Sequence, residues 1–166
     1  MISGPVNLTV PQNVDVIRVE AATEMLQEVL TRADECDIFI ACAAVADYRP
    51  AQIATQKMKK NNAEMNLTFR KNPDILAQVA ALAEPPFTVG FAAETEHLEK
   101  YARQKLEKKN IDMIAANDVS NTDIGFNSEK NALHVLWQDG QAQLPVTDKR
   151  TLAHQLLQLI EQHYSR

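Results

Sequence analysis

The stretch Asp37-Ile-Phe-Ile-Ala-Cys-Ala-Ala44 decides the fold class, because an almost continuous apolar run of this length is typical of a strand buried on both faces of a parallel sheet. The preceding segment, residues 23–33, places Leu26 and Val29 on one face of a predicted helix. Residues 14–19, before that helix, are rich in valine and isoleucine and predict another strand. A strand, an amphipathic helix and a buried strand in succession indicate βα units around a largely parallel sheet.

The same alternation continues toward the C-terminus. Residues 64–69 alternate like a strand, and Asn72 and Pro73 predict a helix start, with Asn72 as the N-cap and Pro73 at the first helical position. The next predicted elements are a strand at residues 87–91, a helix at residues 97–109 and a buried strand at residues 111–116. The polar segment at residues 46–62 is long for a βα connection, and loops of more than about 12–15 residues are more often functional than idle.

The pattern changes near the end of the chain. Residues 133–138 and 141–146 predict a hairpin with Asp139-Gly140 as its turn, because Asp-Gly favours the turn type that matches strand twist. A final helix at residues 148–163 carries Leu152, Leu156, Leu159 and Ile160 inward. We therefore expect an α/β fold: a Rossmann-like, largely parallel sheet flanked by helices, with a C-terminal β-hairpin and a final helix, in one domain of 166 residues.

The composition, with 45% apolar and 23% charged residues, is that of an ordinary soluble globular protein. No apolar run approaches the roughly 18 residues of a membrane span, and the N-terminus lacks the features of a secretory signal, so we expect a cytoplasmic protein. Cys36 and Cys42 are too few for a disulfide framework and predict reduced thiols. The net charge of −5 disfavours binding to nucleic acid but leaves room for a local basic pocket.

Three predicted strands end in small residues that polar residues follow at once. The three segments are Cys42-Ala-Ala-Val-Ala-Asp47, Gly90-Phe-Ala-Ala-Glu94 and Ala115-Ala-Asn-Asp118. In an open parallel sheet, ligands bind outside the carboxyl ends of the strands. Alanines leave room there, and carboxylate or amide groups can meet sugar hydroxyls or a cation. Tight packing against helices explains any one of these segments, but three together favour a ligand site.

The helix predicted at residues 97–109 carries cations on its inward face. Leu98, Ala102 and Leu106 define that face, and Lys105 and Lys109 fall within it. The outward residues are Glu99, Lys100, Arg103 and Glu107. A buried ammonium group needs a carboxylate, water or an anionic ligand. The helix dipole is a sufficient reason for Lys109, so Lys105 is the stronger candidate for contact with an anion.

Further phosphate-binding features are weaker when each is taken alone. Lys57-Met-Lys-Lys60 lies in the long loop, where mobile cations can close over phosphates, although such a run is usually solvated surface. The helix start at Pro73 presents free N–H groups that can bind phosphate. The four glycines form neither a P-loop nor a GxGxxG fingerprint, and the four histidines show no metal-binding spacing, so metal ligands are not assigned.

Five motifs in order resemble the bacterial phosphopantothenoylcysteine synthetase family, also called phosphopantothenate–cysteine ligase. They are Ala43-Ala-Val-Ala-Asp-Tyr48, Lys57-Met-Lys-Lys60, Lys71-Asn-Pro-Asp-Ile75, Val89-Gly-Phe-Ala-Ala-Glu94 and Ala116-Asn-Asp-Val119. The resemblance covers nearly the whole chain, and five motifs in order are far more specific than any one of them.

The resemblance implies that the nucleotide is CTP. The residues implied in nucleotide binding are Ala43, Asp47, Lys57, Pro73, Asp74, Ile75, Leu76, Phe91, Lys105 and Lys109, and Lys57 is implied to be catalytic. The implied reaction has two steps. The carboxylate of 4'-phosphopantothenate attacks the α-phosphate of CTP to give an acyl-cytidylate and pyrophosphate, and the amine of cysteine then displaces CMP. Mg²⁺ and positioned lysines would stabilise the charge that converges in such a transition state.

The resemblance also implies a homodimer within a larger, multifunctional enzyme of coenzyme A biosynthesis. Family members usually follow a flavin-dependent decarboxylase, whose FMN belongs to that other half. They begin with a further strand and a Ser/Gly-rich loop, and Ile2-Ser-Gly-Pro5 resembles the end of their second strand. We therefore expect that this chain lacks the first strand and that loop.

Two other interpretations remain. Tyr101-Ala-Arg-Gln-Lys105 has the Tyr-x-x-x-Lys spacing of NAD(P)-dependent short-chain dehydrogenases, which would make the protein an oxidoreductase that uses Tyr101 and Lys105. This spacing is weak evidence, and the five motifs named above have no place in a dehydrogenase. The third interpretation is a module without catalytic activity whose role is assembly.

Overall fold

The computed structural model describes residues 1–54, 56, 64–120 and 128–164. Their contacts divide the chain into two compact units. Unit 1 comprises Met1–Val29 and Ala43–Ile75, and unit 2 comprises Leu30–Cys42 and Leu76–Arg166. The expectation of a single ligase domain over all 166 residues stays a prediction.

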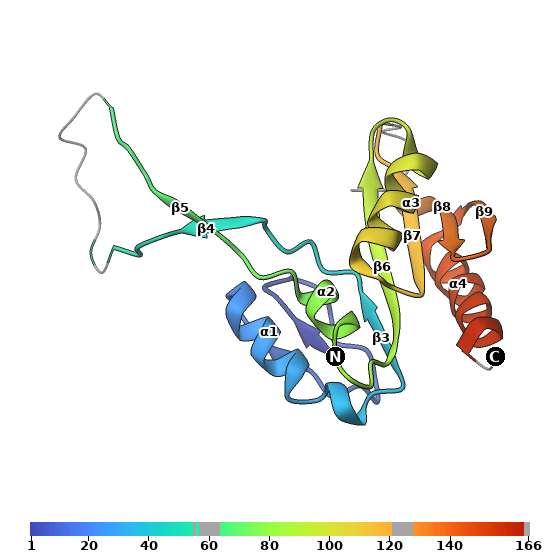
Figure 1. The fold of residues 1–166 in the computed structure, drawn as a ribbon, viewed down its shortest axis with the longest axis horizontal. Helices are drawn as coiled ribbons and strands as arrows, with labels where there is room; N and C mark the ends of the chain where they lie inside the picture. The colour runs from blue at the N-terminus through green and yellow to red at the C-terminus, as the bar shows by residue number, and fades with distance from the viewer. Residues whose placement is uncertain (55, 57–63, 121–127, 165–166) are drawn as a thin grey trace. The chain divides into compact units, whose positions relative to one another are not determined.

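Unit 2 is built on a five-stranded sheet with the order β3-β6-β7-β8-β9. The strands are β3 (Ile38–Ala41), β6 (Phe87–Glu94), β7 (Met113–Asp118), β8 (Lys130–Trp137) and β9 (Gly140–Asp148). β3, β6 and β7 run parallel, whereas β8 and β9 each run antiparallel to the strand before them (Figure 1). The predicted fold class, a largely parallel sheet with a C-terminal hairpin and a final helix, is confirmed.

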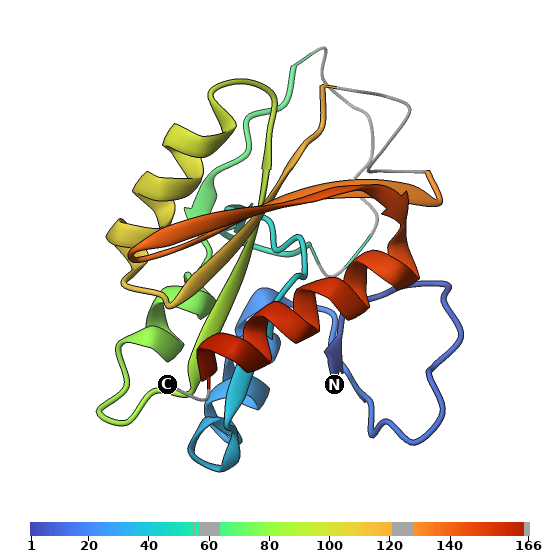
Figure 2. The same cartoon turned by 90° about the vertical axis from the view of Figure 1, so that its right-hand side faces the viewer.

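Helices cover both faces of this sheet because its central strands are apolar on both faces. α3 (Leu98–Lys109) and α2 (Ile75–Ala80) pack on one face, and α4 (Lys149–Tyr164) crosses the other (Figure 2). The period of two along a strand divides its side chains between these cores: Ala92 joins Ala102 and Leu106 beneath α3, while Val89 packs with residues of α4. The α4 residues that reach the core are Leu152, Leu156 and Ile160, with Leu159 partly buried, as predicted.

Gly90 shows how closely α2 approaches β6. A Cβ atom at this position would lie 2.7 Å from Leu76 Cδ2 and 3.0 Å from Ile111 Cδ1. The side chains of Leu76 and Ile111 would therefore have to move if any residue other than glycine stood here.

The hairpin between β8 and β9 turns one residue earlier than predicted. Trp137 and Gly140 are register partners, so the connecting residues are Gln138 and Asp139 rather than the predicted pair Asp139-Gly140. The Trp137 ring occupies the space where a side chain at position 140 would lie, since a Cβ there would be 2.8 Å from Trp137 Cζ2. Gly140 is thus the first residue of β9.

A polar cluster fixes the amino ends of β6 and β7 relative to each other. Asp112 Oδ2 accepts hydrogen bonds from the backbone N–H and the hydroxyl of Thr88, both at 2.7 Å. The backbone N–H of Asp112 in turn donates to Thr88 Oγ1 at 3.1 Å. Thr88 is buried, so its polar atoms depend on these partners.

Unit 1 contains two small strand pairs and a helix. β1 (Ile2–Ser3) and β2 (Ile17–Arg18) are parallel, and β4 (Tyr48–Pro50) and β5 (Phe69–Lys71) are antiparallel. α1 (Ala22–Leu30) follows β2, and a short 3-10 helix, η1 (Ala33–Glu35), leads into β3. The carboxylate of Glu24 caps α1 by accepting the N–H groups of Glu20 and Ala21, which hold its pKa below the ordinary value.

Several predicted boundaries in unit 1 are wrong. The strand predicted at residues 14–19 has only two paired residues, and the one predicted at residues 64–69 is paired at Phe69–Lys71 instead. The segment predicted as a loop at residues 46–62 contains β4. These strands form through pairing with segments distant in the chain, which local composition does not reveal.

We predict that Asp112→Asn lowers the free energy of unfolding by about 1–3 kcal/mol, because a charged acceptor of two hydrogen bonds from a buried threonine is lost. Urea denaturation would measure the change. Asp139→Asn, at the exposed turn, is the matched control and should stay within about 0.5 kcal/mol of the unmodified protein. Equal unfolding midpoints for the two variants would contradict the structural role of Asp112.

Candidate functional site

The carboxyl edge of β6 and β7 carries two acidic side chains. Glu94 ends β6 and Asp118 ends β7, and the two are register partners, so their side chains leave the same face of the sheet. The alternation along β6 and β7 places both on the α3 face, with Ala92 and Ala116. β3 pairs with the other side of β6, so the three predicted strand ends belong to neighbouring strands.

Asp118 is held as a carboxylate by its neighbour. The hydroxyl of Ser120 donates to Asp118 Oδ1 at 2.6 Å, and the backbone N–H of Ser120 donates to the same atom at 2.8 Å. These hydrogen bonds lower the pKa of Asp118 below its ordinary value, with the hydroxyl contributing most. The edge of the sheet therefore keeps a negative charge at neutral pH.

Lys105 on α3 reaches this edge. Its Nζ lies 2.6 Å from Glu94 Oε1, and the exposed fractions of the two side chains are 45% for Lys105 and 14% for Glu94. Lys105 is thus exposed rather than buried on the inward face that the helical period had predicted, and its ammonium group lies beside the carboxyl end of β6. An ion pair this exposed typically contributes no more than about 1 kcal/mol. A phosphate could therefore replace the carboxylate at little cost, and Glu94 is a partner that the sequence reasoning did not identify.

Phe91 lies on the opposite face of the sheet from Lys105. It follows the alternation of Val89, on the α4 side, but α4 does not cover it, and its side chain is 38% exposed. Its register partner on β7 is the small residue Ala115. An exposed ring beside an alanine is a suitable surface for a base, but the structure does not bring Phe91 and Lys105 to one face.

Lys109 is half-buried in the last turn of α3, one turn after Lys105. A cation at this position is favoured by the helix dipole. The position agrees with the sequence prediction but does not separate a structural role from a role in ligand binding.

The prediction that Arg103 points outward is wrong. Its guanidinium donates to the backbone carbonyls at the β8–β9 turn: to Trp137 O, to Gln138 O at 3.3 Å and to Gly140 O at 3.4 Å. The arginine is long enough to reach past the edge of α3, so a face assigned from helical period alone misplaces it. Arg103 ties α3 to the hairpin.

The geometry does not favour the dehydrogenase interpretation. The ring of Tyr101 packs edge-on against His97, with ring centroids 5.9 Å apart. The ammonium of Lys105 is paired with Glu94. Neither arrangement is the phenol and ammonium pair that the Tyr-x-x-x-Lys spacing suggested.

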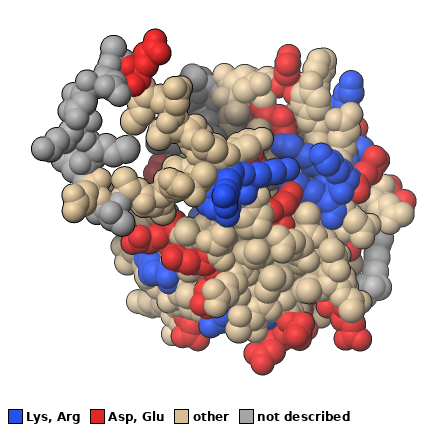
Figure 3. All heavy atoms as spheres, turned by 60° about the vertical axis from the view of Figure 1, so that its left-hand side comes forward, with Lys and Arg blue, Asp and Glu red and all other residues tan. Residues whose placement is uncertain are grey.

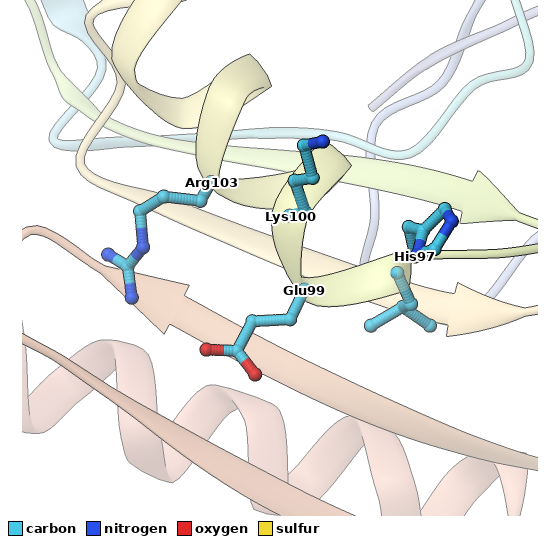
Figure 4. A pocket seen from close by; sticks show the side chains of 5 residues that line it. His97, Glu99, Lys100 and Arg103 are labelled. Carbon is cyan, nitrogen blue, oxygen red and sulfur yellow. The ribbon is translucent and has the colours of Figure 1, made fainter.

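A shallow hollow lies at the start of α3 (Figure 4). Its lining residues are His97, Leu98, Glu99, Lys100 and Arg103. Figure 4 shows Lys100 pointing away from the side on which Glu99 and Arg103 lie. The hollow has mixed charge and contains none of the residues predicted to bind nucleotide.

In unit 1, Asn72 brings two of the predicted site segments together. Its backbone N–H donates to Asp47 O at 2.7 Å, and its side-chain Nδ2 donates to Ala46 O at 2.8 Å. Its Oδ1 accepts a hydrogen bond from Arg49 Nη1 at 2.8 Å. The prediction that Asn72 caps α2 is therefore wrong, as is the placement of Pro73 at the first helical position, because α2 begins at Ile75. The amide is used to bridge two loops instead.

The remaining predicted residues differ in their exposure. Ala43, Asp47 and Asp74 are exposed and Pro73 is half-buried, whereas Ile75 and Leu76 are buried, so any ligand would meet those two through their backbone. Lys57 lies outside the described residues, as do Met58, Lys59 and Lys60. Unit 1 holds Ala43, Asp47, Pro73, Asp74 and Ile75, and unit 2 holds Leu76, Phe91, Lys105 and Lys109.

The described residues were also compared with the requirements of a metal site and of a membrane-spanning helix. Within the ranges that the structure describes, no group of three or more histidine, cysteine, aspartate or glutamate side chains is placed to hold a metal ion. None of the helices described has both the length and the apolar composition needed to cross a membrane.

Comparison with known proteins covers almost the whole chain. The family described as DNA/pantothenate metabolism flavoprotein C-terminal domain matches residues 1–164. The coenzyme A biosynthesis bifunctional protein CoaBC of Vibrio vulnificus (strain CMCP6) is 52% identical over 164 residues, which cover 97% of this chain and 41% of that protein. CoaBC of Escherichia coli (strain K12) is 49% identical over 168 residues, with 99% and 41% covered. The chain therefore spans about two fifths of the length of these curated relatives.

Two solved structures are similar to this chain over almost its whole length. The C-terminal domain of the coenzyme A biosynthesis bifunctional protein CoaBC matches with a TM-score of 0.79 and 33% identity, over 97% of this chain and 71% of that chain. The DNA/pantothenate metabolism flavoprotein from Streptococcus pneumoniae has the same fold, with a TM-score of 0.77 at 20% identity over 96% of this chain and 79% of that chain.

Proposed function

The chain belongs to the DNA/pantothenate metabolism flavoprotein C-terminal domain family, and on that basis we propose that it is the phosphopantothenate–cysteine ligase part of a coenzyme A biosynthesis enzyme. The observation that carries this proposal is the match over residues 1–164, which includes all five motifs found in the sequence. The relatives at 49% and 52% identity are bifunctional proteins of coenzyme A biosynthesis, which supports the same role here.

The proposed reaction uses CTP to activate a carboxylate. A carboxylate oxygen of 4'-phosphopantothenate attacks the α-phosphorus of CTP, the bond to the β-phosphate oxygen breaks, and pyrophosphate leaves. The amine of cysteine then attacks the acyl carbon of the acyl-cytidylate, loses a proton and displaces CMP. Such transfers depend mainly on positioning and on stabilisation of developing negative charge.

The residues of the chain supply these two effects. In the proposal, Lys105 leaves Glu94 and contacts the phosphates of the nucleotide at the carboxyl edge of the sheet. The segments around Asp47 and Pro73, which Asn72 joins within unit 1, contribute backbone and carboxylate groups to nucleotide binding. Phe91 offers a surface for the cytosine ring, and Lys57 stabilises the charge on the phosphates during transfer.

Mg²⁺ fits this site only as an ion that the nucleotide brings with it. Of the two carboxylates at the edge, Glu94 pairs with Lys105 and Asp118 accepts hydrogen bonds from Ser120. Mg²⁺ usually keeps several waters and is held by substrate phosphates together with one or two carboxylates. Asp118 or Glu94 could serve in that way, and the ion would neutralise phosphate charge.

We also propose that the chain works inside a longer protein in the cytoplasm. The relatives are bifunctional and longer than this chain, which supports fusion to a flavin-dependent decarboxylase half that carries FMN. The first strand and the Ser/Gly-rich loop of the ligase would belong to that longer protein.

The ribbon formed by β4 and β5 supports the proposed homodimer. Cross-strand partners share a face, so Tyr48 with its partner Lys71 and Phe69 with its partner Pro50 lie on one side of the ribbon. Tyr48 and Phe69 are exposed by 59% and 54%, so this face is mainly apolar. Met65 and Leu67 continue the apolar positions at intervals of two before Phe69, and both are exposed as well. A two-stranded ribbon is marginally stable alone, and an exposed apolar face of this kind is typical of an interface.

We predict that the chain binds CTP at least about tenfold more tightly than ATP, the effect of roughly one well-placed hydrogen bond to the base. Isothermal titration calorimetry with CTP, ATP and NADH would measure the three affinities. Lys105→Ala should weaken CTP binding without unfolding the protein. Lys108 is exposed on the same helix, and Lys108→Ala should leave CTP affinity unchanged. Equal affinity for CTP and ATP would count against the cytidylyl assignment, and preference for NADH would revive the dehydrogenase interpretation.

We predict that Lys57→Gln in the longer bifunctional protein slows pyrophosphate release roughly 100-fold or more while changing CTP affinity much less. A positioned cation that acts in the transition state is worth about 3–4 kcal/mol, by analogy with a preorganised donor. Lys59→Gln in the same run is the matched control. Near-normal pyrophosphate release by the Lys57 variant, with 4'-phosphopantothenate present, would show that Lys57 is solvated surface.

We predict that Phe69→Ser shifts the protein from dimer toward monomer, because it removes an apolar group from the ribbon face. Sedimentation velocity over a range of concentrations would measure the shift. Leu157→Ser, 51% exposed on α4, is the control and should leave the dimer intact. A monomeric unmodified chain, or an unchanged dimer in the Phe69 variant, would rule out this interface.

A further inference from the structure

Two arginines face each other across the β4–β5 ribbon. Arg49 and Arg70 are register partners, so their side chains leave the same face, the one opposite Tyr48 and Phe69. Directly opposed side chains have Cβ atoms about 4.5–5.5 Å apart, and like charges at such positions repel each other. The ribbon thus carries Tyr48, Pro50, Phe69 and Lys71 on one face and the two arginines on the other.

The charge of this pair is not neutralised by the protein within the ranges that the structure describes. Arg49 Nη1 donates to Lys71 O at 3.1 Å and to Asn72 Oδ1 at 2.8 Å, and both acceptors are uncharged. No described carboxylate lies within ion-pair distance of either guanidinium, and Arg70 is exposed. Arg49 is half-buried, so its guanidinium is held in a fixed orientation while its charge remains available.

The pair lies beside the segments already placed in the candidate site. Asn72, which accepts the hydrogen bond from Arg49, also binds Asp47 O and Ala46 O. The arginine face of the ribbon is therefore connected directly to the loop at Asp47 and to the start of the segment at Pro73. In the proposed dimer, the apolar face is the one that is covered, which leaves the arginine face for a ligand.

We propose that Arg49 and Arg70 form a binding site for a phosphoryl group of a substrate. A guanidinium presents a planar fork of donors that matches phosphate oxygens, and two forks side by side favour a dianionic or more highly charged group. The assignment of the group to a substrate rests on the proposed ligase function. Two substrates carry this chemistry: 4'-phosphopantothenate as a phosphate monoester and CTP as a triphosphate.

The competing explanation is that these are ordinary solvated surface charges. The hydrogen bonds of Arg49 weigh against it, because they fix its guanidinium, whereas a solvated arginine would keep its conformational freedom. On the face shown in Figure 3, Lys and Arg side chains occur in groups and also singly among Asp and Glu side chains.

The test uses Arg70→Gln, because Arg70 is exposed and its side chain makes no hydrogen bond or ion pair with the described residues. Binding of inorganic pyrophosphate, CTP, 4'-phosphopantothenate and phosphate-free pantothenate is measured by calorimetry. Arg150→Gln, exposed on α4, is the matched control with the same change in net charge. Circular dichroism shows that each variant is folded.

We expect Arg70→Gln to weaken pyrophosphate about tenfold relative to Arg150→Gln, the loss of a charge-assisted hydrogen bond. Weakening of 4'-phosphopantothenate alone would assign the site to the phosphate monoester, and weakening of CTP alone would assign it to the triphosphate. Pyrophosphate affinity equal to that of the control would overturn the site even if the chain prefers CTP. If Arg70→Gln weakens pyrophosphate but CTP shows no preference over ATP, the anion site stands and the ligase assignment fails.

Discussion

Burial of β6 on both faces is the constraint on which the rest of unit 2 depends. β6 lies between β3 and β7, and it contributes Val89 to the core under α4 and Ala92 to the core under α3. In a parallel sheet that is covered on both faces, polar and charged side chains lie at the edges. The carboxyl ends of parallel strands meet at the same edge. The positions of Glu94 and Asp118 follow from this arrangement. Gly90, on the same face, leaves room for the side chain of Leu76 on α2.

Two cations that we propose to contact substrate phosphates, Arg49 in unit 1 and Lys105 in unit 2, are held in different ways. Lys105 is paired with Glu94 at 2.6 Å, so a phosphate that binds it must displace a carboxylate. Arg49 is bonded to neutral oxygen atoms, so a phosphate that binds it displaces no counter-charge from the described residues. In the first arrangement the charge of Glu94 offsets that of Lys105, and the second arrangement orients a charge in advance. Both are ways to hold a polyanionic substrate on a protein whose net charge is negative.

The sequence was sufficient for the fold class because the buried strands carry strong local signals. The apolar run that contains β3 and the spacing of Leu152, Leu156 and Ile160 in α4 each point to one structure. It was not sufficient where a residue's role depends on a distant partner. Asn72 has the composition of a helix cap but bridges to Ala46 and Asp47, and Arg103 lies on the predicted outer face of α3 but binds the hairpin.

The parts of the candidate site that have local signals could be predicted from the sequence, and the parts that depend on distant partners could not. The strand-end motifs located the acidic edge, and helical period selected Lys105. The partner of Lys105 and the opposed pair Arg49 and Arg70 could not be found, because they depend on strand pairing and register. The role assigned to Lys57 rests on the resemblance, and it stays a prediction because that residue lies outside the described part of the chain.

The central claim is that the carboxylate of the substrate attacks the α-phosphorus of CTP. The most direct test is mass spectrometry of the CMP formed from 4'-phosphopantothenate whose carboxylate carries oxygen-18 on both atoms. The account predicts that each CMP molecule contains one oxygen-18, because one carboxylate oxygen leaves with the α-phosphate when cysteine displaces CMP. CMP without the label, or label in inorganic phosphate together with release of CDP, would contradict it, since the carboxylate would then not have been activated as an acyl-cytidylate.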